Sequence, residues 1–171
     1  MLPQYIINRR TKAVISIFDE SDNECSMIYE GAESFMVRES PRKIVETTFN
    51  YLGMSLDGAM RVSQHILQRK MKVPVVLSAI DGIALLNCRP VSRKGSIWIV
   101  TDHIEQVRPI DRNKSIIEFK GGQSVAVLMN SKSLQNKRNE AAFLILTIME
   151  KLKRRTPRSA INVYEEDSYT G

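Results

Sequence analysis

The order of apolar and polar positions divides the chain into a first part of mixed character and a second part rich in short strands. Apolar runs at Tyr5–Asn8 and Ala13–Phe18, separated by the polar Arg9–Lys12, predict a β-hairpin near the N-terminus. The polar turn Asp19–Glu24 then leads into CSMIYE (Cys25–Glu30), which predicts a further strand.

From Val73 to Met129, short apolar runs alternate with turn signals. Proline cannot donate to a sheet ladder, so Pro74 marks the first run, VPVVL, as an edge strand or the start of a strand. Gly121 and Gly122 can supply the positive φ of a tight turn, and SIIEFKGGQSVAVL therefore predicts a hairpin. The predicted strands after VPVVL are IALLNC, SIWIV, HIEQV, SIIEF and SVAVLM.

Two helices are indicated before this strand-rich part. Ser40 can cap a helix over residues 41–52 and Gly53 can end it, and a second helix is favoured from about Leu56 to Ile66. Apolar residues on one face of the first helix predict that it covers a sheet. That face consists of Val45, Phe49 and Leu52.

A third, long helix is predicted from about Ser133 to Arg154, and its middle carries little polar surface. Such a segment is either packed deeply or shared with another subunit. We expect a homodimer formed through one stripe of this helix. The stripe assigned to oligomerisation consists of Ala141, Ile145, Ile148 and Leu152, widened by Phe143, Leu144 and Leu146.

These elements together predict an α+β fold dominated by an antiparallel β meander, with a covering helix near residues 41–52 and a long C-terminal helix. A chain of 171 residues has room for one domain with a sizeable core. We place that domain at residues 1–154, followed by a flexible acidic tail at residues 155–171.

Composition favours a soluble globular protein, with 43% hydrophobic and 26% charged residues. The start MLPQYIINRR lacks the pattern of a signal peptide, and the longest nearly apolar run, Ala141–Met149, is too short to span a bilayer. We therefore expect a cytoplasmic protein with no membrane partner. Its two cysteines, Cys25 and Cys88, are expected to be reduced and buried.

Positive charge is concentrated in one part of the chain. The net charge is +6, but residues 67–158 carry eighteen Lys/Arg against seven Asp/Glu, whereas residues 159–171 carry three acids and no base. This asymmetry suggests a polyanionic partner, nucleic acid first and an anionic membrane surface second. A solvated basic face without a partner is the alternative that composition leaves open.

The sequence offers little support for catalysis or for a metal. It contains no Gly-rich phosphate loop and no paired C-x-x-C motif. Cys25, Cys88, His65 and His103 are isolated from one another, whereas structural zinc sites use closely spaced pairs. His103 stands in the acidic segment DHIE but is expected to be an exposed strand residue rather than a general base. We predict no enzyme activity, no catalytic residue, no metal and no cofactor.

The basic residues form a more coherent set, because most of them fall in the turns between successive predicted strands. Bases in successive turns can converge at one end of a sheet and meet phosphates there. The run KLKRR (Lys151–Arg155) is better explained by the preference of cations for a helix C-terminus. The residues assigned to DNA binding are Arg89, Arg93, Lys94, Arg108, Arg112, Lys114, Lys120, Lys132, Lys137 and Arg138.

The stretch RPVSRKGSIWIVTDHIEQV (Arg89–Val107) joins a basic turn to the chain's one tryptophan. IWIV alternates as a strand and tryptophan is usually largely buried, so we expect Trp98 in the core. We interpret SIWIV and HIEQV as a rigid strand pair that presents the basic turn.

The sequence resembles the ComK family of bacterial competence transcription factors from about Tyr5 to Met149. The resemblance rests on the order and spacing of several segments, and it departs from the family pattern at LNCRP (Leu86–Pro90), which suggests a divergent paralogue. The matching segments are CSMIYE, SPRKIVETTFNYLG, GMSLDG, KVPVVL, IWI with HIEQV, and SIIEFKGGQSVAVLMNSKSL.

The resemblance implies a sequence-specific activator of competence genes, located at the nucleoid, that binds paired AT-rich boxes in double-stranded DNA, largely through the minor groove. The implied activator binds as dimers that associate further on DNA. The resemblance also implies an adaptor that delivers the protein to a Clp-type protease through a C-terminal segment. Here that segment would be INVYEED, with Ile161, Val163 and Tyr164 as its apolar contacts. A protein-interaction module without DNA affinity and an RNA-binding protein are the alternatives.

Overall fold

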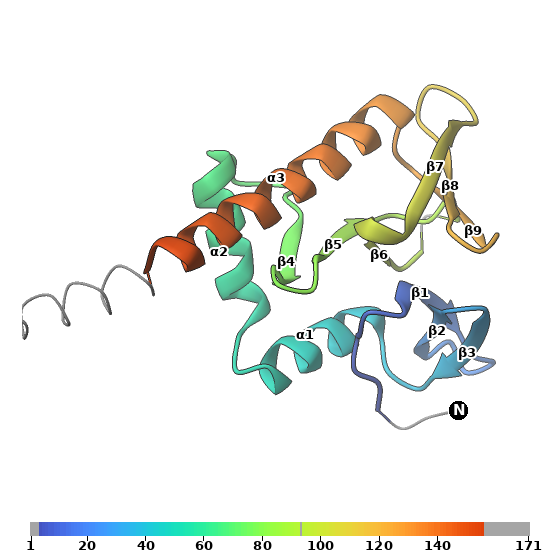
Figure 1. The fold of residues 1–171 in the computed structure, drawn as a ribbon. Helices are drawn as coiled ribbons and strands as arrows, with labels where there is room; N and C mark the ends of the chain where they lie inside the picture. Colours follow the sequence, from blue (N-terminus) through green and yellow to red (C-terminus); the bar gives the residue numbers. More distant parts are fainter. Residues whose placement is uncertain (1–3, 93, 156–171) are drawn as a thin grey trace, which may run out of the picture.

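The structure, a computed structural model, describes residues 4–92 and 94–155 and has the α+β architecture that the sequence predicts (Figure 1). Two antiparallel sheets and three helices make up the fold. The elements are β1 (Thr11–Phe18), β2 (Glu24–Glu30), β3 (Glu33–Val37), α1 (Pro41–Tyr51), α2 (Leu56–Leu67), β4 (Val75–Ser78), β5 (Ile83–Cys88), β6 (Ile97–Val100), the 3₁₀ turn η1 (Thr101–His103), β7 (Ile104–Pro109), β8 (Ser115–Phe119), β9 (Ser124–Val127) and α3 (Ser131–Arg155).

The larger sheet joins two short meanders. Its strand order is β3-β2-β1-β6-β5-β4, so β1 and β6 are central neighbours although most of the first half of the chain separates them. In their antiparallel register Val14 pairs with Trp98. The smaller sheet has the order β7-β8-β9. Strand β4 lies at the edge that Pro74 predicts.

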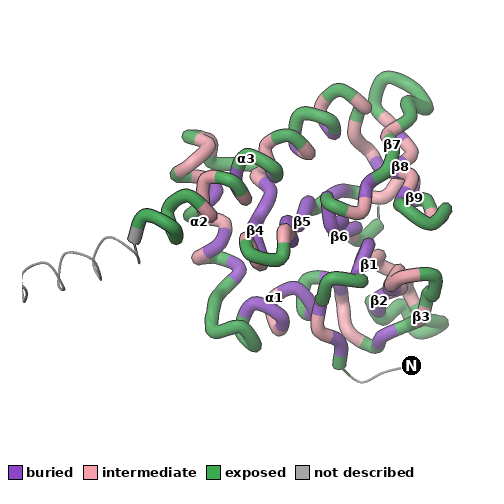
Figure 2. Tube along the Cα trace, viewed as in Figure 1, coloured by how far each residue is buried: buried purple, intermediate pink, exposed green. Residues whose placement is uncertain are grey.

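The centre of the six-stranded sheet is buried on both faces. On β6, Trp98 and Val100 join the core beneath α1 and α2, whereas Ile97 and Ile99 join the core formed with the small sheet and the start of α3. A strand covered on both faces has no polar side, which explains the uninterrupted apolar run IWIV. The burial map shows β5 and β6 as the buried centre of the molecule (Figure 2). The core position predicted for Trp98 is confirmed.

Helix α1 begins and ends where the sequence predicts. The Ser40 hydroxyl accepts a hydrogen bond from the Lys43 amide at 3.3 Å, and Gly53 adopts a φ of +74° just after the helix. Val45 and Phe49 are fully buried, but Leu52 is 48% exposed. The face that covers the sheet is therefore completed by Ile44 and not by Leu52.

Two predicted strand pairings are wrong. Residues Tyr5–Asn8 form no strand, because both edges of β1 are occupied by β2 and β6. The segment packs instead against α1, where the Ile7 amide donates to Thr48 Oγ1 at 3.1 Å. The proposed pair of SIWIV with HIEQV is also wrong, since the turn η1 leads β7 into the second sheet. The basic turn belongs instead to the antiparallel pair β5 and β6.

Most of the apolar stripe of α3 packs within its own chain, and its use in oligomerisation stays a prediction. Ala141 is fully buried with Leu144 against β4 and β5, and Ile145 and Ile148 pack partly buried on the same cluster. Leu152 lies in the last turn of α3 and is 47% exposed. The exposed apolar side chains of the middle of α3 are Phe143 and Leu146, at 54% and 67% exposure. No helix within the described residues is long and apolar enough to cross a membrane.

Candidate nucleic-acid interface

A groove of about 1110 Å³ lies where the start of α3 faces the ends of β5 and β9. Segments far apart in the sequence meet there: the α2–β4 connection, the β5–β6 loop, the β7–β8 turn and the β9–α3 connection. Its described lining is rich in basic and amide side chains. We call it the basic groove; it is lined by Arg69, Met71, Lys72, Asn87, Cys88, Arg89, Gly95, Ser96, Asn113, Leu128, Met129, Asn130, Ser133, Asn136, Lys137 and Glu140.

Two cations meet at a single carbonyl oxygen in the wall of the basic groove. The Arg69 guanidinium donates to Lys72 O at 2.8 Å, and the Lys137 ammonium donates to the same oxygen. Lys72 holds a φ of +56°, a left-handed conformation that costs a residue with a Cβ about 1 kcal/mol or more. The α2–β4 connection is therefore strained at Lys72, in the conformation that directs the Lys72 carbonyl toward the two cations.

Negative charge compensates only part of this positive charge. Glu140 Oε2 pairs with the Arg69 guanidinium at 2.7 Å, and it is the one acidic residue among the described residues that line the groove. Lys72, Arg89 and Lys137 have no carboxylate partner in the ion pairs of the described chain. An anion entering the groove therefore meets an excess of cations.

Lys137 is the most buried of these cations, with 9% of its surface exposed. Burial lowers the pKa of its ammonium below the ordinary 10.5, and the charges of Arg69 and Lys72 lower it further, while Glu140 and Cys88 oppose the shift. The lowered pKa shows that the folded chain holds this positive charge at a free-energy cost.

This cost predicts a pH dependence of stability. Between the lowered pKa of Lys137 and about 10.4, the unfolded chain binds more protons than the folded chain, so the free energy of unfolding should rise with pH. We expect wild type to gain stability relative to Lys137→Met as the pH rises toward about 10.4 in urea unfolding, since the variant lacks the titrating amine. A constant difference between the two proteins across this range would contradict the assignment.

The first turn of α3 adds donors to the same groove. Asn130 Oδ1 accepts from the Ser133 amide at 2.7 Å, which is N-cap geometry, and both residues line the groove. The N-terminus of a helix carries partial positive charge and unpaired amides. The helix end therefore reinforces the attraction that the side chains provide.

The structure brings part of the predicted basic set to this groove. Arg89 and Lys137 line it directly. Arg112 and Lys114 flank Asn113 in the sequence, and Lys132 precedes Ser133. These three bases are therefore sequence neighbours of residues that line the groove. Arg93 lies outside the described residues.

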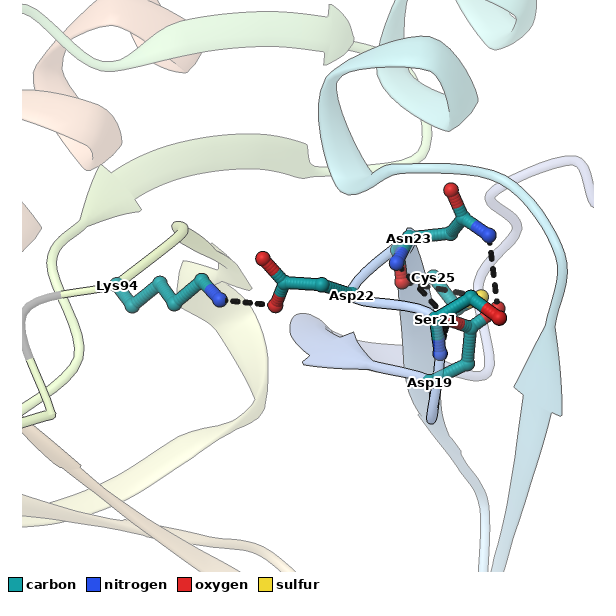
Figure 3. Close-up of polar contacts among 6 residues, drawn as sticks. All are labelled: Asp19, Ser21, Asp22, Asn23, Cys25 and Lys94. Carbon is teal, nitrogen blue, oxygen red and sulfur yellow. Dashed lines mark hydrogen bonds and ion pairs between the residues drawn. The ribbon is translucent and has the colours of Figure 1, made fainter.

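Lys94 stands beside the groove residues Gly95 and Ser96 but directs its charge elsewhere. Its ammonium pairs with Asp22 of the β1–β2 turn (Figure 3). The same ammonium lies 4.0 Å from the centroid of the Phe18 ring. That turn is ordered by Asp19 Oδ1, which accepts from the Asn23 amide at 2.8 Å. This hydrogen bond is the main cause that holds the pKa of the Asp19 carboxyl below its usual range. Lys94 thus fastens the β5–β6 loop to the β1–β2 turn.

The remaining predicted bases lie apart from the groove. Lys120 and Arg138 line a second, smaller pocket of about 180 Å³ together with Asp102, and Arg138 donates to Ile104 O at 2.7 Å. Arg108 pairs across strands with Glu118 at 2.6 Å. The expectation that all ten bases share one cationic rim is therefore too broad, and the groove contains a subset.

One comparison with known proteins identifies a family. The model of the ComK protein family matches residues 2–153. The chain belongs to the ComK family. No curated protein and no solved structure matches it in the other two comparisons. The family consists of competence transcription factors and not of enzymes.

Two cations of the basic groove, Arg69 and Lys72, are missing from the predicted set. They follow α2 in a short connection outside the strand-rich part, where nothing local distinguishes them from solvated charges. The signal that finds them is three-dimensional, because the connection returns to the start of α3 only in the folded chain. A prediction that selects basic residues in the turns between strands cannot find this contact.

The cysteines and histidines of this ComK-family chain fit structural roles. Cys25 and Cys88 are free and buried, as predicted, and burial raises the pKa of Cys88 to about 12, so its sulfur is a thiol at neutral pH. His103 Nε2 lies 2.7 Å from Arg9 O, a contact that joins η1 to the segment before β1. Within residues 4–92 and 94–155, no cluster of three or more metal-ligating side chains occurs.

Proposed function

We propose that this ComK-family protein is a sequence-specific DNA-binding activator of competence genes and that the basic groove is its principal contact with DNA. The observation that carries the proposal is the excess of cations in the groove, where Lys72, Arg89 and Lys137 face a single paired carboxylate. Phosphate contacts of this kind supply most of the electrostatic affinity for DNA.

The groove's composition also favours adenine-rich sites. A-tracts have a narrow minor groove with enhanced negative potential, which attracts inserted arginines. Arg89 is exposed at the start of the β5–β6 loop, and its carbonyl accepts from the Leu128 amide at 2.8 Å, so a firmly held backbone presents its side chain. Hydrogen bonding in the minor groove separates A·T from G·C only coarsely, so specificity comes from groove shape and from the spacing of bound subunits.

Binding assays with three nucleic acids test this function. We expect an A-tract duplex to bind more tightly than a G·C-rich duplex and than structured RNA. If a dimer neutralises six to eight phosphates, log K should fall against log salt with a slope of about −5 to −7. Equal affinity for all three would leave only non-specific charge, preference for RNA would support the RNA-binding alternative, and no binding would favour a protein-interaction module.

We propose dimerisation as part of the same function, through the exposed Phe143 and Leu146 of α3 rather than through the buried part of its stripe. A Leu146→Asp substitution places a charge on that surface without altering a buried contact. We expect light scattering to show a dimer for wild type and a monomer for the variant at the same concentration, with similar circular dichroism. A wild-type monomer at high concentration would refute the proposal.

Proteolytic control remains a proposal from the family resemblance, because Ile161, Val163 and Tyr164 lie outside the described residues. An adaptor of a Clp-type protease would bind this segment through its apolar side chains. Substituting all three by serine should slow adaptor-dependent degradation, and an unchanged rate would remove the segment from the adaptor site.

A further inference from the structure

The basic groove has an apolar wall as well as its cations. Met71, Leu128 and Met129 contribute to its lining, and the Met71 side chain is largely exposed. The phosphates of a nucleic-acid backbone can pair with the cations, but they have no apolar group to pack against this wall. A peptide that combines carboxylates with apolar and aromatic side chains would use both.

One segment of the chain has that combination. From Ser159 to Gly171 the sequence has no Lys or Arg and contains the acidic run Glu165, Glu166 and Asp167. Directly before this run stands the apolar and aromatic INVY (Ile161–Tyr164). The segment also lies beyond residues 2–153, which the family model matches.

Chain length permits this segment to reach the groove. Lys137 precedes Arg155 by 18 residues on α3, which corresponds to about 27 Å along the helix. Glu165 follows Arg155 by ten residues, which an extended chain spans in about 33–36 Å. The acidic run can therefore return along α3 as far as Lys137.

We propose that residues 159–171 bind in cis to the basic groove, with the carboxylates of Glu165–Asp167 at Arg69, Lys72 and Arg89 and the Val163 and Tyr164 side chains against Met71. Ion pairs at exposed groups are individually weak, so a free peptide of this sequence would bind poorly. Attachment to the same chain raises its local concentration to about the millimolar range, which makes a weak contact effective.

The docked segment would cover the cations that the proposed function assigns to DNA. This consequence rests on that function, whereas the docking itself does not. DNA and the segment then exclude one another, and the segment lowers the apparent affinity for DNA by the fraction of chains in which it is docked.

Zero-length crosslinking of the full chain tests the docking without DNA. A water-soluble carbodiimide joins a carboxylate to an amine in direct contact, and mass spectrometry identifies the joined residues. We expect amide links from Glu165, Glu166 or Asp167 to Lys72 or Lys137, within single chains when isotopically labelled and unlabelled protein are mixed. Links confined to Lys151 and Lys153, links to the distant Lys43, or links between chains would overturn the proposal.

A charge-neutral segment tests the consequence. In the full chain, Glu165→Gln with Glu166→Gln and Asp167→Asn should bind A-tract DNA about threefold to tenfold more tightly than wild type at low salt, with a smaller difference at high salt. The control variant changes Glu20, Glu33 and Glu105 to glutamine, which removes the same charge from exposed positions on other elements. Equal gains in both variants would attribute the effect to net charge and overturn the competition.

The two experiments separate this inference from the proposed function. If no nucleic acid binds but the links to Lys72 or Lys137 form, the docking stands and the DNA assignment fails. If A-tract DNA binds but those links are absent and the neutral segment changes nothing, the DNA assignment stands and the docking fails.

Discussion

Changing Lys72 and Arg89 to glutamate is expected to weaken binding to an A-tract duplex by about 100-fold or more at ~0.1 M salt. Both side chains line the basic groove and are exposed, and neither is paired with a carboxylate among the ion pairs of the described residues. Charge reversal removes two phosphate contacts and adds repulsion. Because a bound dimer carries both changes twice, the slope of log K against log salt should also fall in magnitude by about 3 to 4.

A matched control separates the groove from overall charge. Lys43 and Arg61 are exposed on α1 and α2, the helices that cover the opposite face of the six-stranded sheet. Their joint change to glutamate lowers the formal net charge from +6 to +2, as the groove variant does. We expect the control to lose less than about tenfold in affinity, because distant charges are screened by salt. Equal losses would move the DNA contact away from the groove.

The sequence was sufficient to predict most elements because their signals are local. The cap at Ser40, the glycine turn at Gly121–Gly122 and the edge position of the strand after Pro74 each depend on neighbours within a few residues. Strand β3 escaped prediction, since ESFMV is short and largely exposed.

Strand pairing was predictable only in part, because a strand does not encode which distant strand it meets. The pairing of Val14 with Trp98 joins two meanders across more than eighty residues, and no local pattern indicates it. The mistaken pair of SIWIV with HIEQV has the same origin. Adjacent strands usually pair, but the short turn η1 sends β7 into the other sheet.

The candidate site shows the same division. Arg89 and Lys137 could be selected because the sequence pattern places them in a turn and near the start of a helix. Arg69 and Lys72 join them only through the contact of Lys72 O with Lys137. The role of the stripe on α3 in a dimer stays a prediction for a related reason. Periodicity shows that a helix has an apolar side, but it cannot say whether the same chain or another copy covers it.

The second large effect concerns the stability of α3 where it borders the groove. We expect Leu134→Ala to lower the free energy of unfolding by about 2–5 kcal/mol. Leu134 is fully buried in the core between the two sheets, with Ile104 and Phe119. Its truncation removes apolar contacts and leaves a cavity that the surrounding strands cannot fill completely.

Leu146→Ala is the matched control, because it makes the same change in the same helix at a side chain that is 67% exposed. It should alter the free energy of unfolding by no more than about 0.5 kcal/mol, since little buried area is lost. Urea unfolding at low protein concentration measures both, so that any dimer contributes little. Equal losses of unfolding free energy in the two variants would show that the start of α3 is not anchored by this core. Because Leu134 adjoins the groove residue Ser133, Leu134→Ala should also weaken DNA binding near its unfolding midpoint.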